Sequence, residues 1–124
     1  MAVLGYATVG SNRLDEAKAF YDALLGSVGI LPLFEHPSGG RVYGRDGVLC
    51  FGVLAPYDGK TATAGNGSMF AFSFDSRPEI DAFHAQALAL GATDEGAPGV
   101  RGPDWYFSYF RDLDGNKLNV YIME

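Results

Sequence analysis

The chain has 124 residues, close to the usual size of one domain, with 15 acidic against 9 basic side chains and a formal net charge of −6. Because phosphate contacts need clustered Lys and Arg, this balance argues against nucleic-acid binding. The apolar fraction of 48% argues against disorder. No charged-then-apolar leader and no run long enough to cross a bilayer is visible, so we expect a soluble, cytoplasmic protein without a membrane partner.

The first half of the chain predicts one strand, one helix and three short strands. Residues 3–9 predict the first strand. A helix follows, with Asn12 as its N-cap, apolar side chains at helical spacing and Gly26 as a stop. Three strand-like runs come next, at 30–35, 41–44 and 48–54. The dipeptide Asp46-Gly47 predicts a tight hairpin turn between the last two.

The same order then repeats after a Pro-, Gly- and Asp-containing loop. Residues 68–74 predict a strand, and Ser76 with Glu79 predicts a capping box at the start of a helix that ends at Gly91. Residues 92–103 are rich in turn formers. Two closing strands are predicted at 105–110 and 117–123. They flank a turn in which Asp112 and Asp114 are expected to bond nearby backbone N–H groups rather than act as an acid pair.

The two halves resemble each other. Ala19-Phe20-Tyr21 in the first predicted helix matches Ala82-Phe83-His84 in the second, and the turn at Arg45-Asp46-Gly47 matches the one that begins at Arg111. Because the offset is about half the chain, the pattern predicts a tandem duplication. We expect an α+β fold of two tandem βαβββ modules that form a cupped mixed sheet with helices on the outside. Their expected bounds are about 1–56 and about 68–124, joined by a linker at about 57–67, which contains Gly65-Asn66-Gly67.

Alternation along the strands separates two faces of the predicted sheet. Phe70, Phe72 and Phe74 share one face, which should pack on a helix. The opposite faces carry smaller or hydrogen-bonding side chains, as expected for a half-open sheet around a ligand. Aromatic side chains at 105–109 that share the face of Asn119 would add a flat wall.

Two motifs carry a family resemblance: the helix motif that contains Phe20-Tyr21-Asp22, and the run Arg111-Asp112-Leu113-Asp114-Gly115-Asn116-Lys117-Leu118. On these motifs the chain resembles the vicinal oxygen chelate superfamily, which includes glyoxalase I, a lactoylglutathione lyase, as well as bleomycin-resistance proteins and extradiol dioxygenases. The second motif looks like the family's terminal Asp-Pro-Asp-Gly-Asn turn, with Leu113 in place of proline. The resemblance implies the duplicated fold and a homodimer, and it leaves the chemistry open.

The resemblance also implies where metal ligands would stand, on the first and last strand of each half. Carried over position by position, these are Tyr6, Phe51, Met69 and Asn119. Catalytic metal sites draw mainly on His and carboxylate ligands, so these residues predict no metal and no cofactor. The chain's two histidines are expected elsewhere, His36 in a surface turn and His84 packing in a helix. Cys50, in an apolar run, is expected to be a buried strand thiol.

The sequence identifies no catalytic residue. The candidate ligand-binding residues are Tyr6, Thr8, Phe51, Met69, Arg101, Asn119 and Tyr121. Arg101 lies between glycines, where it could meet an anionic ligand or stay solvated.

Three functions stay open. The first is a metal-free protein that binds a small organic or anionic molecule in the sheet cup. The second is a glyoxalase-like lyase or related enzyme with a non-standard metal site or acid–base chemistry at Tyr6, although a tyrosine with an ordinary pKa of about 10 is a poor base at neutral pH. The third is a partner module without a ligand, against which the mixed-polarity face argues.

Overall fold

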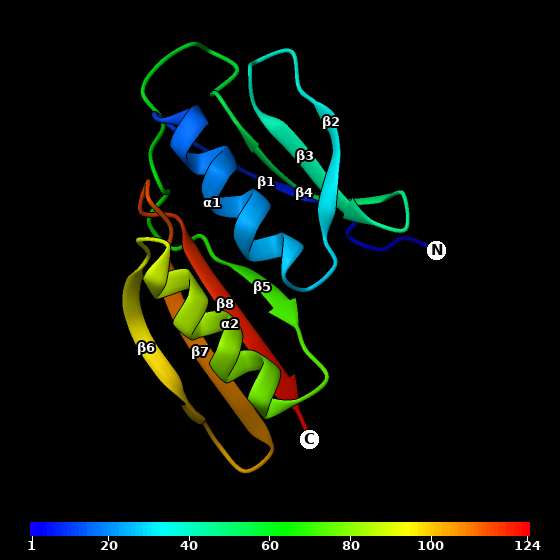
Figure 1. The fold of residues 1–124 in the computed structure, drawn as a ribbon, viewed down its shortest axis with the longest axis vertical. Coiled ribbons are helices and arrows are strands. Elements are labelled where there is room, and N and C mark those ends of the chain that lie inside the picture. Colours follow the sequence, from blue (N-terminus) through cyan, green and yellow to red (C-terminus); the bar gives the residue numbers. More distant parts are fainter. The chain divides into compact units, whose positions relative to one another are not determined.

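The computed structural model describes all of residues 1–124. The chain divides into two compact units, Met1–Ala64 and Gly65–Glu124. Each unit contains a strand, a helix and three further strands in that order (Figure 1). This is the α+β fold with two tandem βαβββ modules that the sequence predicts.

The first unit builds a four-stranded mixed sheet with one helix on one face. Its elements are β1 (Ala7–Gly10), α1 (Leu14–Gly26), β2 (Leu31–Glu35), β3 (Arg41–Arg45) and β4 (Val48–Leu54). The strand order is β1-β4-β3-β2, with β1 parallel to β4 and the other pairs antiparallel. The apolar stripe of α1 is buried, and the Tyr21 ring lies 5.0 Å from Phe51 of β4. The face away from α1 is the open face of this sheet.

The second unit repeats this arrangement. Its elements are β5 (Phe70–Ser73), α2 (Arg77–Ala89), β6 (Thr93–Val100), β7 (Trp105–Arg111) and β8 (Lys117–Met123). The strand order is β5-β8-β7-β6, and only β5 and β8 are parallel. Phe83 of α2 packs 5.0 Å from Phe74 and 6.2 Å from Phe110, ring to ring. The core of this unit therefore lies between α2 and the face predicted from Phe70, Phe72 and Phe74.

Local signals explain most of the element boundaries. Asp46 and Gly47 both adopt positive φ, 52° and 77°, as a tight hairpin turn between β3 and β4 requires. The Ser76 hydroxyl oxygen accepts the Glu79 N–H at 3.3 Å and caps α2. The Asp112 carboxylate accepts the N–H groups of Asp114 and Asn116, each at 2.9 Å, which confirms its role in the turn.

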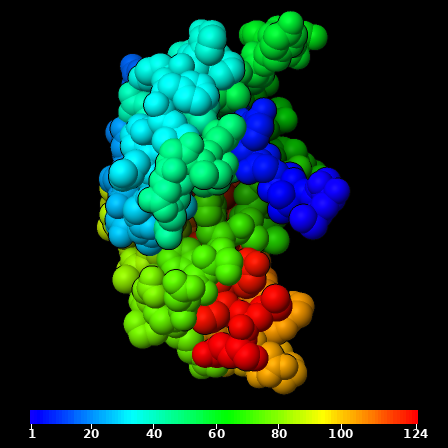
Figure 2. All heavy atoms as spheres, turned by 90° about the vertical axis from the view of Figure 1, so that its right-hand side faces the viewer, coloured from blue at the N-terminus to red at the C-terminus, as the bar shows by residue number.

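The start of the chain differs from the prediction. The first strand begins at Ala7 rather than at residue 3, because β4 pairs only with Ala7–Gly10 and the residues before them have no partner strand. Figure 2 shows this first segment, in blue, standing off the surface. Val3 and Leu4 within it are exposed. Asn12 is not the N-cap of α1. Its side chain instead exchanges two hydrogen bonds with the backbone of Ala62, at 2.7 and 3.0 Å, and so anchors the loop after β4.

The turn-rich run at 92–103 contains an eight-residue strand, β6, that turn composition did not indicate. It lies at the edge of its sheet and pairs only with β7. Its register shifts twice, between Asp94 and Gly96 and between Gly96 and Gly99. An edge strand tolerates Gly and Pro because one side of its backbone needs no ladder partner.

A polar network lies on the helix side of the first sheet. Arg41 forms ion pairs with Asp22 of α1 and with Glu35 of β2, the latter at 2.6 Å. The buried Tyr43 donates its hydroxyl hydrogen to the other Asp22 oxygen at 2.7 Å. These contacts tie α1 to the sheet. Neither helix is long and apolar enough to span a bilayer.

Candidate functional site

The open face of the first sheet is set by the strand register. Thr8 pairs with Gly52, which pairs with Val42 on the other side. Their neighbours along the strands, Val9, Val53 and Tyr43, are buried on the helix side. A cavity of about 280 Å³ lies over the open face; its lining residues are Tyr6, Thr8, Phe34, His36, Val42, Leu49, Gly52 and Leu54.

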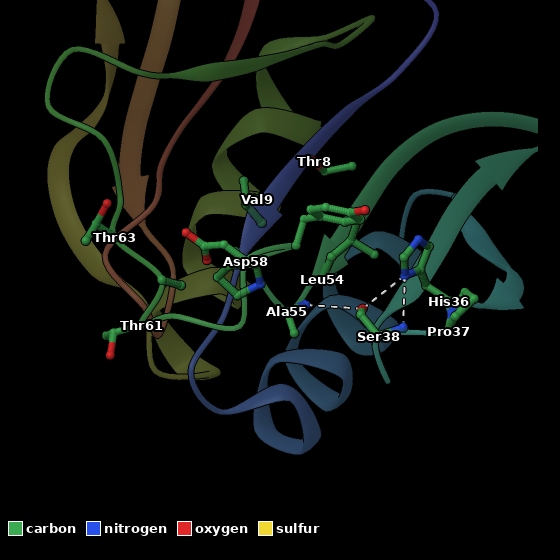
Figure 3. A pocket seen from close by; sticks show the side chains of 14 residues that line it. Thr8, Val9, His36, Pro37, Ser38, Leu54, Ala55, Asp58, Thr61 and Thr63 are labelled. Carbon is green, nitrogen blue, oxygen red and sulfur yellow. Dashed lines mark hydrogen bonds between the residues drawn. The ribbon is translucent and has the colours of Figure 1, made fainter.

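A larger open groove of about 900 Å³ shares Thr8, His36 and Leu54 with this cavity. It runs along the ends of β1 and β4, between the β2–β3 turn and the loop that follows β4. Figure 3 shows His36, Pro37 and Ser38 at one end and Thr61 and Thr63 at the other. Segments from four places in the sequence therefore converge on one surface.

Hydrogen bonds hold His36 at the edge of the groove. Its Nδ1 accepts the N–H of Ser38 at 3.1 Å and lies 3.0 Å from the Ser38 hydroxyl oxygen. That oxygen also accepts the N–H groups of Gly40 and Ala55, each at 3.3 Å. The β2–β3 turn is thus tied to the end of β4. His36 does lie in a turn, as predicted, but its place on the groove was not foreseen, because no local pattern shows which strand end the turn adjoins.

The groove is rich in hydroxyl groups and poor in charge. Thr8, Ser38, Thr61 and Thr63 contribute hydroxyls between apolar side chains. Asp58 is its one charged residue, and no Lys or Arg lines it. Tyr6 is 56% exposed and its hydroxyl makes no hydrogen bond. The cavity that Tyr6 lines also contains His36, and no Lys or Arg lines it.

The open face of the second sheet carries the aromatic wall. In the register of β7 with β8, Tyr109 lies opposite Asn119 and Phe107 opposite Tyr121. The ring of Trp105 stacks on Phe107 at 5.3 Å with an interplanar angle of 8°, and the Phe107 and Tyr121 rings lie 5.2 Å apart. These side chains share the face that Asn119 occupies, whereas the alternate residues of β7 pack under α2.

Two further predicted residues lie on or beside this second face. Met69 immediately precedes β5 and is 44% exposed. Asn119 is buried, and its side-chain nitrogen donates to the Ser108 carbonyl at 3.0 Å, which fixes the orientation of the amide. The structure thus groups Tyr6 with Thr8 in the first unit, and Met69, Asn119 and Tyr121 in the second.

Phe51 does not lie on the open face. Its side chain is 1% exposed and packs on the helix side against Tyr21. Phe51 follows Asp46-Gly47 at the same spacing as Asn119 follows Asp114-Gly115, and this spacing predicts an outward position. The register of β3 with β4 shifts between Tyr43 and Gly44, so the outward position on β4 lies one residue later. The position that faces outward is Gly52, which pairs with Thr8.

Arg101 also stands apart from the other candidates. Its guanidinium donates to the Ala97 carbonyl at 2.7 Å, next to Gly96 and Gly99 of the edge strand β6. It lines neither the cavity nor the groove of the first unit. The absence of side chains at Gly96 and Gly99 leaves room for the Arg101 side chain to fold back along β6.

The residues do not fit the metal that the family resemblance implies. The corresponding open-face positions hold Tyr6, Gly52, Met69 and Asn119, which include no imidazole and no carboxylate. No three His, Cys, Asp or Glu side chains come close enough to hold a metal ion. His84 packs in the core of the second unit, where its Nδ1 lies 3.1 Å from the Ser108 hydroxyl oxygen and its Nε2 lies 3.3 Å from Asp94.

Comparison with solved structures places this fold among known proteins. A glyoxalase/bleomycin resistance protein from Albidiferax ferrireducens T118 is 40% identical, with a TM-score of 0.89 over 99% of this chain and 100% of that chain. A lactoylglutathione lyase from Agrobacterium tumefaciens is 19% identical, with a TM-score of 0.72 over 98% and 94% of the two chains. A fosfomycin resistance protein from Listeria monocytogenes is 16% identical, with a TM-score of 0.74 over 100% and 95%. The last two share the fold alone.

A comparison with curated proteins finds no match. The family model described as Glyoxalase/Bleomycin resistance protein/Dioxygenase superfamily matches residues 3–120. The match covers both βαβββ units, including β1 and most of β8. The chain therefore belongs to the glyoxalase/bleomycin resistance protein/dioxygenase superfamily.

Proposed function

We propose that this chain binds a small organic molecule on the open face of its first sheet, without the metal ion that the family resemblance implies. The observation that carries the proposal is the groove of about 900 Å³ that meets the smaller cavity at Thr8, His36 and Leu54. Ligand sites of small molecules are concave, largely apolar and supplied with a few convergent polar groups. The groove combines these features along the ends of β1 and β4, where it adjoins the open face.

Two further observations support binding rather than metal-assisted chemistry. The open-face positions that correspond to family metal ligands hold side chains that coordinate divalent ions poorly. The aromatic wall of the second unit, formed by Trp105, Phe107 and Tyr121, offers a second flat surface for a ring.

A fragment screen by NMR in the presence of EDTA tests this function. Methyl groups of Thr8, Val42 and Leu54 line the proposed site and report on it directly. We expect a subset of neutral and aromatic fragments to shift these signals, with saturable titration curves. If a library of several hundred fragments shifts no signal on either open face, the proposed function is wrong.

The assembly state belongs to the same proposal. We expect a homodimer on the family resemblance, and light scattering after gel filtration would then report twice the mass of one chain. A monomeric mass would refute the dimer and leave the groove of the first unit as described, since every residue that lines it comes from one unit of one chain.

A further inference from the structure

We propose that the groove of the first unit selects neutral or cationic ligands that carry an acceptor oxygen, such as that of a carbonyl group, and that His36 is the hydrogen-bond donor that recognises this oxygen. The proposal rests on the proposed binding function and specifies the class of ligand. It follows from the tautomer of His36, from the direction of its free nitrogen and from the charges that line the groove.

The hydrogen bonds around Ser38 fix the tautomer of His36. The backbone N–H of Ser38 can only donate, and it points at Nδ1 from 3.1 Å, so Nδ1 carries no proton. The Ser38 hydroxyl oxygen already accepts from the N–H groups of Gly40 and Ala55, which leaves its own hydrogen to point at Nδ1. The neutral imidazole therefore carries its proton on Nε2.

The Nε2–H group is available to a ligand. His36 lines both the cavity and the groove, and no protein group accepts a hydrogen bond from its Nε2. Figure 3 shows both hydrogen bonds of the ring leaving one nitrogen toward Ser38, while the other nitrogen points away from the turn. A ring held by its Nδ1 presents the opposite N–H in a fixed direction. An acceptor oxygen on a ligand is the partner that this donor fits.

The charge of the lining sets which acceptors are favoured. Asp58 is the one charged residue in the groove, and no Lys or Arg is present to pair with an anion. The Asp58 carboxylate is held by the N–H of Lys60 at 2.9 Å, which keeps it at the groove. A ligand carboxylate would face this charge in a protein whose net charge is already −6. A neutral carbonyl avoids the repulsion, and an added ammonium group gains attraction.

Three small probes with the same benzene ring separate these contributions: benzamide, 4-(aminomethyl)benzamide and benzoate. Each is titrated into the protein while the methyl signals of Thr8, Leu54 and Thr61 are followed by NMR. We expect both amides to shift these signals, the aminomethyl compound with higher affinity. Benzoate should bind at least about fivefold more weakly than benzamide, and the difference should shrink as salt rises.

Variants of His36 test the donor. The side-chain oxygen of His36→Asn can accept the Ser38 N–H in place of Nδ1, but the shorter side chain places no donor where Nε2 stood. Benzamide should bind it roughly three- to tenfold more weakly, while its melting temperature stays near that of the unmodified protein. The amide nitrogen of His36→Gln reaches about where Nε2 stood and should restore much of the binding. This rescue separates recognition from turn stability.

Asp58→Asn tests the charge, and Asp46→Asn is its matched control. Both remove one negative charge from the first unit, but Asp46 lies in the exposed β3–β4 turn and lines neither the cavity nor the groove. Asparagine tolerates the positive φ of 52° at that position. Asp58→Asn should strengthen benzoate binding and weaken that of the aminomethyl compound by about threefold or more, and Asp46→Asn should change neither.

The outcomes distinguish this inference from the function on which it rests. Benzoate binding in the groove as tightly as benzamide, or His36→Asn binding like the unmodified protein, would overturn the inference and leave small-molecule binding intact. Probes that shift only signals of the second sheet would do the same. Failure of these probes and of the fragment library on both faces would overturn the inference and the proposed function together.

Discussion

The hydroxyl of Tyr43 joins β3 to α1. Tyr43 is fully buried, and its hydroxyl donates to Asp22 at 2.7 Å while Arg41 holds the other oxygen of the same carboxylate. Replacing Tyr43 by Phe leaves the packing and removes the donor. We expect a loss of about 1–2 kcal/mol of unfolding free energy, measured by urea denaturation at neutral pH. An unchanged midpoint would mean that Arg41 alone satisfies Asp22.

The same residue predicts a pH dependence. Burial, and then its hydrogen bond to Asp22, raises the pKa of the Tyr43 hydroxyl above its ordinary value of 10.0. A group whose pKa is raised by folding contributes stability that is complete below the unfolded pKa and is lost as the pH rises. The stability advantage of the unmodified protein over Tyr43→Phe should therefore shrink above about pH 10. A constant difference up to pH 11 would contradict this.

Cys50 is half-buried on β4 rather than fully buried as the sequence predicts, and it provides a second test at the scale of one residue. Burial raises the pKa of its thiol, and Arg45 opposes this only in part. Because the thiolate is the reactive form, iodoacetamide should modify the folded protein at pH 8 at least about tenfold more slowly than the urea-unfolded chain. Mass spectrometry at timed intervals measures both rates. Equal rates would show that Cys50 is an accessible thiolate and would reopen a chemical role for it.

At the scale of elements, the two helices start differently although the units repeat. α2 has a side-chain cap, Ser76, whereas the N-cap position of α1 is Arg13 and offers none. Ser76→Ala should lower the unfolding free energy by about 1 kcal/mol, measured by thermal or urea denaturation.

Asn12→Ala should leave the start of α1 intact and instead speed amide exchange at Ala62, the actual partner of Asn12. Loss of α1 protection in Asn12→Ala would restore the predicted capping role.

Two glycines of the first unit should respond in opposite ways to replacement by alanine, because one is closely packed and the other is not. A Cβ on Gly44, at the irregular point of the β3–β4 pairing, would stand 2.1 Å from the Val48 carbonyl oxygen. A Cβ on Gly26, the last residue of α1, would meet nothing within 4 Å. Gly44→Ala should therefore destabilise by about 2 kcal/mol or more, while Gly26→Ala should be neutral or stabilising by about 0.5–1 kcal/mol. Similar melting temperatures for the two variants would refute this reading of the sheet.

The elements also show which local signals suffice. Turn dipeptides and the capping box located the β3–β4 hairpin and α2, because each signal acts within a few residues. β6 could not be predicted, since its Gly- and Pro-containing sequence becomes a strand only beside β7. The same dependence on distant partners explains why the place of His36 on the groove and the face of Phe51 were not predicted. The turn that holds His36 meets the end of β4, and the face of Phe51 depends on an irregular register.

At the scale of the whole molecule, the internal repeat was the strongest guide from the sequence. Equivalent helix positions, Tyr21 and His84, are both buried, and both units have the same strand order. The duplication therefore predicted the fold. It did not predict the outward position on β4, where Phe51 packs on the helix side and Gly52 pairs with Thr8. It could not predict the ligand, because the groove of the first unit is built from turns and loops that the second unit does not repeat.

The central claim is that ligand binding on these sheets needs no divalent metal. Calorimetric titration of the EDTA-treated, dialysed protein with nickel, zinc and ferrous ions tests it most directly. We expect no stoichiometric heat and no shift of signals near Tyr6, Met69 or Asn119. Benzamide should bind equally with and without each ion. One ion bound per chain at micromolar affinity on an open face, or benzamide binding that requires it, would contradict the account.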